Sequence, residues 1–389
     1  MTYTIEKVTT LIGARRYGDR DGNVGFILTD SRSLCFPEET LFFALKSERN
    51  DGHNYIPELY RRGVRNFVVS QVPKGYASDY PEANFLKVVN TLEALQRLAE
   101  RHRDEFNIPI VGITGSNGKT MVKEWLHQLL SPSMFVTRSP RSYNSQIGVP
   151  LSVWLLNEQT QVGVFEAGIS QPGEMLALRD IIQPTIAVLT YLGAAHQENF
   201  ESLEAKCREK IILFHDADTI VYNGDDKTVS GVVNEYKDYK GEKLFWSFRD
   251  TKAPFFVKNV EKKGNLSIIT YIYKGEEDSY SLPFIDEASV TNSIIAAVVS
   301  RRLGLSAEEL DKRMALLEPV AMRLEVKEGQ HGCTLINDSY NSDINSLDIA
   351  LDFMSRRPDH KGRRHTLILS DIFQSGESAK DLYHEVSDL

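Results

Sequence analysis

The sequence has 389 residues, of which 41% are hydrophobic and 25% charged, a composition typical of a globular protein with two or three domains. Its 45 Lys and Arg residues are outnumbered by 54 Asp and Glu residues, and the formal net charge of -9 argues against a protein that binds nucleic acid through its phosphates. No segment approaches the ~20 apolar residues of a membrane span, and the N-terminus lacks a signal-peptide pattern, so we expect a cytoplasmic protein. Cys35, Cys207 and Cys333 lie far apart in the sequence, and we expect reduced, packed thiols.

Residues 1–106 are predicted to form a small α/β domain. Apolar extended runs occur at Thr40–Leu45 and Phe67–Ser70, and a helical pattern lies between them at Tyr55–Arg62. A longer helix is predicted at Leu92–His102, where apolar residues recur every three or four positions.

Residues 107–318 are predicted to form the central domain, which opens with the continuous apolar run Ile108–Thr114. Such a run is typical of a strand buried on both faces of a parallel sheet. Helical and extended segments then alternate as in βαβ units, at Val122–Leu130, Val162–Glu166, Glu174–Ile182, Thr185–Leu189, Leu203–Phe214 and Thr219–Tyr222. Short alternating runs from Phe255 to Tyr280 predict antiparallel strands appended to this sheet, and a helix at Thr291–Leu303 closes the domain.

Residues 319–389 are predicted to form a third domain. Strands are expected at Thr334–Asn337 and Thr366–Ser370, a helix at Ser346–Met354, and a last helix that runs to the end of the chain. Because about 70 residues are short for a doubly wound domain, we expect the chain to end inside it.

The strongest motif is the segment Gly112–Thr120, GITGSNGKT, between a predicted buried strand and a predicted helix. Glycines let backbone N–H groups approach a phosphate, Lys119 suits the β- and γ-phosphates, and the Thr120 hydroxyl suits Mg²⁺. The usual P-loop spacing has glycine where this chain has Ile113, so the loop is a variant. The alternative is a glycine-rich turn with a coincidental Gly-Lys-Thr.

GITGSNGKTMVKEW resembles the ATP loop of the Mur ligase family, the amide-forming enzymes of peptidoglycan precursor synthesis, whose pattern is GxxGxxGK[TS]. Further segments resemble the branch that adds D-alanyl-D-alanine to UDP-N-acetylmuramoyl-tripeptide, and the resemblance covers nearly the whole chain. These segments are Tyr143–Leu151 (YNSQIGVPL), Phe165–Gly168 with Pro172–Glu174, Ala195-His196 with Lys210, and Asn337–Asn341 (NDSYN).

The resemblance implies the α/β architecture of a three-domain Mur ligase. A UDP-substrate domain is followed by a central P-loop domain with a mostly parallel sheet plus antiparallel strands, and by a Rossmann-like C-terminal domain of which this chain carries a part. It also implies an ADP-forming carboxylate–amine ligase that uses ATP and two Mg²⁺ and proceeds through an acyl phosphate. Phosphoryl transfer of this kind depends on positioning and on stabilising phosphate charge, which a phosphate loop, a lysine and Mg²⁺ provide.

Particular residues receive roles from the resemblance. ATP binding is implied for Gly115, Ser116, Asn117, Gly118, Lys119, Thr120, Asn292, Arg323 and Asp338. Mg²⁺ binding is implied for Thr120, Glu166, His196 and Lys210, and catalysis for Lys119, Asn144, His196 and Lys210. In the family the lysine at 210 is carbamylated, which converts a cation that would repel Mg²⁺ into an anion.

From the residues alone, four of these positions have a plainer interpretation. Glu166 would be a solvated carboxylate after a strand, His196 a surface residue of a loop, and Lys210 a solvated lysine beside Glu209. Arg323 would be a surface cation paired with Glu325.

The first domain resembles the family's UDP-binding module through Thr29–Arg32 (TDSR), Phe42–Lys46 (FFALK) and Asp51–His53 (DGH). Substrate binding is therefore implied for Ser31, Arg32, Lys46, Asp51 and His53, and for Ser145 near the acceptor carboxylate. An arginine suits two-point contact with a diphosphate.

The resemblance departs at Ala288 and Ser289, where the family carries a His-Asn pair near adenine, so it supplies no adenine contacts. Because some relatives continue into an alanine racemase, a fused or adjacent racemase domain is a possible partner. Three alternatives stay open: a sister ligase that adds a single amino acid, a non-catalytic UDP-sugar and ATP-binding module, and a P-loop hydrolase. The third residue of the peptide, diaminopimelate or lysine, is not predicted.

Overall fold

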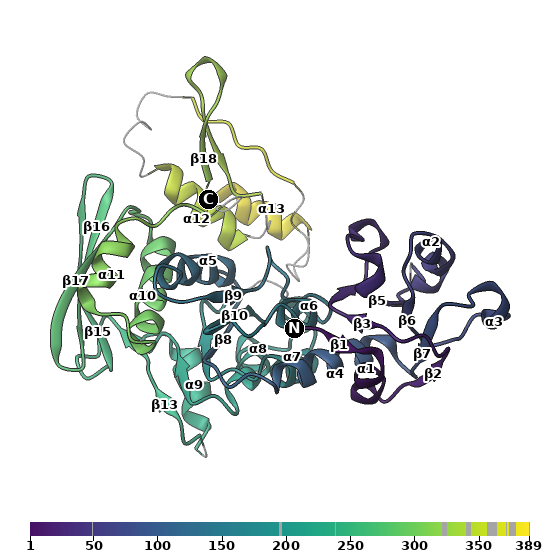
Figure 1. Ribbon diagram of the computed structural model, residues 1–389. Helices are drawn as coiled ribbons and strands as arrows, with labels where there is room; N and C mark the ends of the chain where they lie inside the picture. Colours follow the sequence, from purple (N-terminus) through teal and green to yellow (C-terminus); the bar gives the residue numbers. More distant parts are fainter. Residues whose placement is uncertain are drawn as a thin grey trace. The chain divides into compact units, whose positions relative to one another are not determined.

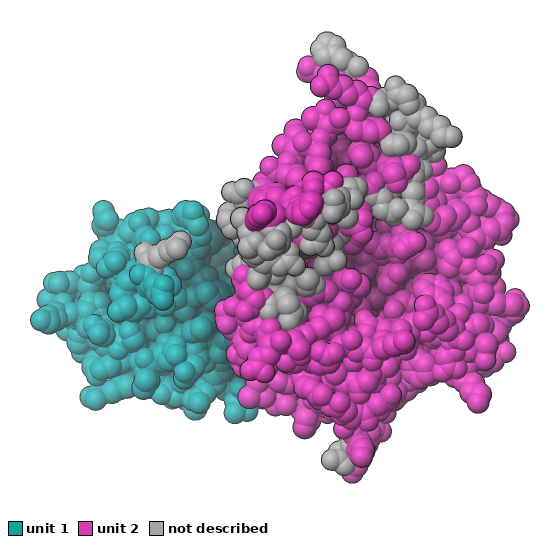
Figure 2. Space-filling model, turned by 180° about the vertical axis from the view of Figure 1, so that it is seen from behind, with its two compact units in different colours: residues 1–108, 143–160, 180–182 teal, residues 109–142, 161–179, 183–389 magenta. Residues whose placement is uncertain are grey.

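The computed structural model divides the chain into two compact units (Figure 2). Each unit has hydrophobic core clusters of its own. Unit 1 comprises residues 1–108, 143–160 and 180–182, and unit 2 comprises residues 109–142, 161–179 and 183–389. The boundaries predicted at 106/107 and 318/319 stay predictions. The structure describes residues 1–48, 50–193, 197–237, 239–320, 325–339, 344–355, 364–370, 372 and 379–388.

Unit 1 is built on a five-stranded sheet in the order β2-β7-β6-β5-β4 (Figure 1). β4 to β7 are parallel neighbours and β2 is antiparallel at the edge. The sheet strands are β2 (Arg15–Tyr17), β4 (Phe26–Leu28), β5 (Thr40–Phe43), β6 (Asn66–Val69) and β7 (Asn84–Lys87), and a separate pair is β1 (Tyr3–Thr4) with β3 (Asn23–Val24). The helices are α1 (Ile5–Ile12), α2 (Ile56–Arg61), α3 (Tyr76–Asp79), α4 (Thr91–Arg103) and α6 (Gly148–Val153). The predicted strands and helices of this region are confirmed, with shifts of a few residues at their ends.

The central strands of the unit 1 sheet are buried on both faces: consecutive strand residues point to opposite sides, and every residue of β5 and β6 is buried. Leu41 and Phe43 lie in one core, into which α1 and α4 also pack, whereas Phe42 lies in the other core with residues of α2. The period-3.6 pattern of α4 places Leu95 and Leu98 on its buried face, and Asn90 caps the first turn.

Unit 2 contains a six-stranded, fully parallel sheet in the order β13-β12-β11-β8-β10-β9, which confirms the predicted parallel sheet. Every residue of β8 and β10 is buried, as the continuous apolar runs predict. The strands are β8 (Ile110–Thr114), β9 (Val136–Arg138), β10 (Val162–Glu166), β11 (Ile186–Leu189), β12 (Thr219–Val221) and β13 (Glu242–Lys243). Its helices include α5 (Lys119–Leu130), most of α7 (Glu174–Ile182), α8 (Leu203–Lys210) and α9 (Lys227–Glu235).

The antiparallel strands belong to a four-stranded sheet that is joined to the parallel sheet at Trp246, which pairs in parallel with Asn223 after β12, in line with the predicted arrangement. Its order is β14-β15-β16-β17, and α10 and α11 pack beside it (Figure 1). Most of α10 is buried, because it lies in the core shared by α5 and the strands of both sheets. The elements are β14 (Trp246–Ser247), β15 (Phe255–Lys263), β16 (Leu266–Tyr273), β17 (Glu276–Leu282), α10 (Glu287–Arg302) and α11 (Ala307–Met314).

The C-terminal part of unit 2 contains the antiparallel pair β18 (Glu325–Glu328) and β19 (Thr334–Asn337), then α12 (Ile344–Ser355) and α13 (Ala379–Asp388). The strand predicted at Thr366–Ser370 is wrong: this segment is exposed and pairs with no described strand.

The structure also bears on the cysteines and on membrane-spanning helices. The expectation of packed thiols holds for Cys207 and is wrong for Cys35 and Cys333, which are exposed free cysteines. None of the helices in the described part of the chain is long and apolar enough to cross a membrane.

Candidate nucleotide and metal site

The phosphate loop joins β8 to α5 and depends on two glycines with positive φ. Gly115 has φ 143° and Gly118 has φ 86°. A Cβ at Gly115 would lie 2.0 Å from Thr190 Oγ1, and one at Gly118 would lie 2.4 Å from Asn292 Oδ1. Only glycine therefore fits at either position, both by backbone conformation and by space.

The loop is anchored to the segment that follows β11. The backbone N–H of Ser116 donates to the carbonyl of Tyr191 at 2.6 Å, and the Ser116 hydroxyl exchanges hydrogen bonds with the backbone of Gly193 at 2.9 and 3.0 Å. The Thr190 hydroxyl donates to the carbonyl of Asn117 at 2.6 Å. These bonds anchor the loop to the segment after β11 and fix its shape, as a preorganised phosphate site would require.

Lys119, the first residue of α5, lies across the loop. Its Nζ atom donates to the carbonyls of Gly115 at 2.8 Å and Ser116 at 2.9 Å. The ammonium group thus lies at the N-terminus of a helix beside the loop glycines, where a phosphate would meet both a charge and the positive end of the helix dipole.

Two buried lysines of α8 reach the same region. Lys210 is 3% exposed and its Nζ atom donates to the carbonyl of Gly115 at 3.2 Å, while Lys206 Nζ donates to the carbonyl of Gly193 at 2.5 Å. Burial, and then the nearby ammonium groups of Lys119 and Lys206, hold the pKa of Lys210 well below its ordinary value. The interpretation of Lys210 as a solvated lysine is therefore wrong.

A hydroxyl and a carboxylate face each other at the first turn of α5. Thr120 Oγ1 lies 3.2 Å from Glu166 Oε2, and Glu166 at the end of β10 is fully buried, so its interpretation as a solvated carboxylate is also wrong. The Ser142 hydroxyl lies 3.2 Å from Thr120 Oγ1. Hydroxyl and carboxylate oxygens at the carboxyl edge of a parallel sheet are the hard ligands that Mg²⁺ takes, so this pair fits the metal.

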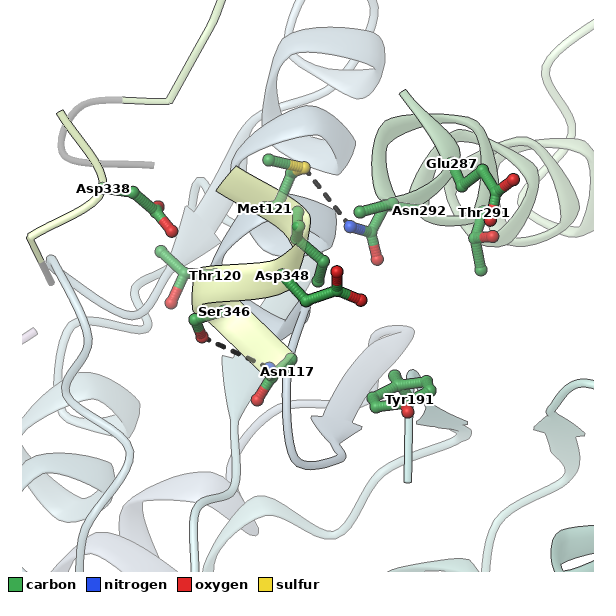
Figure 3. Close-up of a pocket in the computed structure, with 13 residues that line it drawn as sticks. Asn117, Thr120, Met121, Tyr191, Glu287, Thr291, Asn292, Asp338, Ser346 and Asp348 are labelled. Carbon is green, nitrogen blue, oxygen red and sulfur yellow. Dashed lines mark hydrogen bonds between the residues drawn. The ribbon is translucent and has the colours of Figure 1, made fainter. Parts of the chain in front are cut away.

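A cavity of about 270 Å³ opens beside the loop, between α5, α10 and α12 (Figure 3). Asn292 of α10 lies against it and donates through Nδ2 to the Met121 sulfur at 3.3 Å. Two residues of the C-terminal part also line the cavity. The Ser346 hydroxyl accepts a hydrogen bond from Asn117 Nδ2 at 3.4 Å, and the Asp338 carboxylate lies at the cavity wall. The lining residues are Asn117, Gly118, Thr120, Met121, Tyr191, Glu287, Ala288, Thr291, Asn292, Asp338, Ser346, Asp348 and Ile349.

In unit 1 the predicted substrate residues follow the carboxyl ends of parallel strands, the edge where ligands of such sheets bind. Ser31 and Arg32 follow β4, and the exposed Arg32 guanidinium makes two-point contact with Asp30 at 2.6 and 2.9 Å. Hydrogen bonds from Arg32 lower the pKa of Asp30 to about 2. Arg32 is thus held at the edge with an exposed face.

The segment after β5 carries Lys46, Asp51 and His53, and these three are brought together. His53 Nδ1 lies 2.7 Å from Asp51 Oδ1, and Lys46 Nζ lies 3.8 Å from the same carboxylate. His53 Nε2 accepts a hydrogen bond from the backbone N–H of Ser70 after β6 at 3.1 Å. Hydrogen bonds from His53 lower the pKa of Asp51. His53 therefore ties the loop after β5 to the end of β6.

Four predicted site residues remain, and the structure describes two of them, Asn144 and Ser145. Asn144 is half-buried and Ser145 exposed in unit 1, and the Ser145 hydroxyl accepts from the backbone N–H of Gly148 at 3.2 Å. His196 and Arg323 lie outside the described residues.

Sequence reasoning missed several residues that contact the site, among them Thr190, Lys206 and Lys123, whose ammonium lies 3.1 Å from Glu166 Oε1. Lys123 is four residues after Lys119 and Lys206 four residues before Lys210, so helical spacing was a usable signal for both. Nothing in the sequence near Thr190 indicated its contact with the loop.

Residues 113–300 match the family model of the Mur ligase middle domain. This central region is similar to the middle domain of the Mur ligases, and the similarity to curated relatives extends over nearly the whole chain. A similar curated relative is the UDP-N-acetylmuramoyl-tripeptide–D-alanyl-D-alanine ligase of Bacillus subtilis, 28% identical over 92% of this chain and 76% of that protein. The Escherichia coli protein of the same name is 25% identical over 100% of this chain and 83% of that protein.

Solved Mur ligases share this fold. MurF from Acinetobacter baumannii superposes with a TM-score of 0.87 at 23% identity and covers 99% of this chain and 83% of that one. MurF from Thermotoga maritima, solved in complex with ADP, gives a TM-score of 0.73 at 24% identity over 85% of this chain and 74% of that one. The α/β Mur ligase architecture expected from the motifs is confirmed.

Proposed function

We propose that this chain is an ATP-dependent, ADP-forming ligase that joins UDP-N-acetylmuramoyl-tripeptide to D-alanyl-D-alanine in peptidoglycan precursor synthesis. The observation that carries the proposal is the preformed phosphate loop, with Lys119 across it and the Thr120–Glu166 oxygen pair beside it. The relatives match this chain over nearly its whole length, and the two substrates that are joined, UDP-N-acetylmuramoyl-tripeptide and D-alanyl-D-alanine, are taken from the names of those relatives.

The reaction couples phosphoryl transfer to amide formation. An oxygen of the peptide carboxylate attacks the γ-phosphorus of ATP, the bond to ADP breaks, and an acyl phosphate forms. The amine of the dipeptide then attacks the acyl carbon, the C–O bond to phosphate breaks, and the amine loses a proton. ADP, phosphate and the amide are the products.

The residues of the loop bind and orient ATP. The N-terminus of α5 and the ammonium of Lys119 stabilise the phosphate charge that is redistributed during transfer. Asn292 and Asp338 border the cavity beside the loop and are assigned to the nucleotide. Thr120 and Glu166 would hold Mg²⁺, which when bound neutralises phosphate charge.

A second Mg²⁺ site and carbamylation of Lys210 belong to the same proposal. A neutral lysine amine adds CO₂ through a new N–C bond and releases a proton, and burial among the ammonium groups of Lys119 and Lys206 favours the neutral form. The resulting anion beside Gly115, together with His196, would hold the second ion.

The acceptor is assigned to unit 1, with Ser31, Arg32, Lys46, Asp51 and His53 on the UDP moiety and Asn144 and Ser145 on the peptide carboxylate. Arg323 is assigned to ATP. The cytoplasmic location and the alanine racemase partner stay predictions.

The test measures ADP release with ATP and Mg²⁺, adding the UDP-tripeptide and D-alanyl-D-alanine separately and together. Release is expected only with both, and not with the tripeptide plus single amino acids. Phosphate release without acceptors would favour a hydrolase, and release with one amino acid would favour a sister ligase. Nucleotide binding without release of ADP or phosphate would favour a non-catalytic binding module.

A further inference from the structure

Lys123 is a buried cation that none of the proposed catalytic steps uses. It lies one helical turn after Lys119 on α5 and its side chain is fully buried. Burying an ammonium group is costly unless charged partners compensate it, so the partners of Lys123 indicate what it does.

The first partner is the candidate metal ligand Glu166. Lys123 Nζ lies 3.1 Å from Glu166 Oε1, and both side chains are 0% exposed. The other carboxylate oxygen, Oε2, lies 3.2 Å from Thr120 Oγ1. The ammonium thus occupies one side of the carboxylate and leaves the other directed at the Thr120 hydroxyl.

The second partner is the turn after β9. Lys123 Nζ donates to the carbonyl oxygen of Arg141, a non-glycine residue with φ 49°. Such a conformation is unfavourable for a side chain with a Cβ and persists where neighbouring contacts hold it. The same turn carries Ser142, whose hydroxyl contacts Thr120 Oγ1.

We infer that Lys123 is a positioning residue for the Mg²⁺ of the nucleotide: it holds Glu166 with its Oε2 toward the Thr120 hydroxyl, and the carbonyl of Arg141 in turn holds the Lys123 ammonium in place. This inference rests on the proposed ATP–Mg²⁺ site. Outer-sphere partners that orient a metal ligand are a recurring feature of metal sites, and their loss costs about 10–100-fold in metal affinity. The competing expectation is electrostatic, because removing a cation near the site would by itself strengthen Mg²⁺ binding.

The experiment measures binding of a fluorescent ATP analogue as Mg²⁺ is titrated, in wild type and in Lys123→Met, which keeps most of the side-chain length without the charge. The half-saturating Mg²⁺ concentration is expected to rise by about tenfold or more, with little change in analogue binding in EDTA. Glu124→Gln is the matched control, because Glu124 Oε1 also pairs with Lys123, at 3.0 Å, while its Oε2 pairs with Arg138, at 2.9 Å. Its Mg²⁺ dependence is expected to match wild type.

A double-mutant cycle separates positioning from a general structural role. Glu166→Gln is expected to raise the half-saturating Mg²⁺ concentration. Adding Lys123→Met to Glu166→Gln is expected to cause no further rise, because Lys123 acts through Glu166. The double variant removes both buried charges, so it is also the comparison to use if Lys123→Met alone does not fold.

Three results would overturn the inference: an unchanged or lower Mg²⁺ requirement in Lys123→Met, a rise in Glu124→Gln as large as in Lys123→Met, or a further rise on adding Lys123→Met to Glu166→Gln. Failure of the wild-type chain to bind the analogue in a Mg²⁺-dependent way is a different outcome, because it contradicts the proposed nucleotide site itself.

Discussion

The Nζ atom of Lys210 lies 3.2 Å from the carbonyl oxygen of Gly115, so a buried lysine of α8 contacts the first glycine of the phosphate loop across 95 residues of sequence. This contact places a group of depressed pKa beside the proposed phosphate and metal site. Both the expected carbamylation of Lys210 and the importance of Lys210 for turnover can be measured directly.

Turnover is expected to depend on CO₂ through Lys210. Wild-type activity should fall in carefully decarbonated buffer and return with bicarbonate, and enzyme treated with ¹³C-bicarbonate should show a carbamate carbon signal that Lys210→Ala lacks. Lys210→Ala should lose nearly all turnover and regain part of it with a short carboxylate such as acetate, since an anion is what the site lacks. Activity indifferent to bicarbonate, with no ¹³C signal, would contradict carbamylation.

Gly118→Ala is expected to abolish most nucleotide binding. The new Cβ would lie 2.4 Å from Asn292 Oδ1 at a residue with φ 86°, and we expect a loss of about 1–3 kcal/mol in the free energy of unfolding. Gly231→Ala is the matched control: this glycine lies in α9, nothing lies within 4 Å of its Cβ position, and stability should rise by about 0.5–1 kcal/mol. Thermal unfolding and titration with ATP would measure both. Normal ATP binding by Gly118→Ala would refute the loop geometry.

The stability of unit 1 is expected to fall on acidification because of His102. Its ring lies between the hydroxyl of Tyr3, 2.9 Å from Nδ1, and the carbonyl of Leu156, 3.0 Å from Nε2. Burial lowers its pKa from 6.5 to about 4. Between these values the unfolded chain binds the proton and the folded chain does not, so stability is full above pH 6.5 and is lost as the pH falls toward 4.

At pH 5 this loss amounts to about 2 kcal/mol. Urea unfolding at pH 7.5 and pH 5, with His102→Gln in parallel, measures it. Wild type should lose more stability than the variant between the two pH values. Equal losses would mean that His102 titrates normally in the folded protein.

Arg32→Gln is expected to raise the KM for the UDP-tripeptide about tenfold with a small change in kcat, because a guanidinium at the sheet edge contributes to substrate and transition-state binding alike. Arg101→Gln, which removes an exposed arginine paired with Asp104 on α4, is the control and should leave both constants unchanged. Steady-state kinetics with the UDP-tripeptide varied would decide. A fall in kcat at unchanged KM would place Arg32 elsewhere in the reaction.

The phosphate loop was predictable from the sequence because its residues are contiguous between a buried strand and a helix. The position of Glu166 at the ligand edge was also predictable, since it ends a buried strand of a parallel sheet, whereas its Mg²⁺ role came from the family resemblance and stays a prediction. The contacts from Thr190 and Asn292 were not, because they depend on which strand neighbours β8 and on where α10 packs. The apolar run Thr366–Ser370 was misassigned because periodicity does not reveal whether a partner strand exists.

The acyl-phosphate ligation itself is tested most directly by isotope transfer. The carboxylate of the UDP-tripeptide is labelled with ¹⁸O and incubated with the enzyme, ATP, Mg²⁺ and D-alanyl-D-alanine, and the phosphate and the amide product are analysed by mass spectrometry. One ¹⁸O atom is expected in each phosphate released, together with a product enlarged by the dipeptide, and neither should form with Lys119→Ala. Unlabelled phosphate, or phosphate released without the amide product, would contradict the proposed reaction.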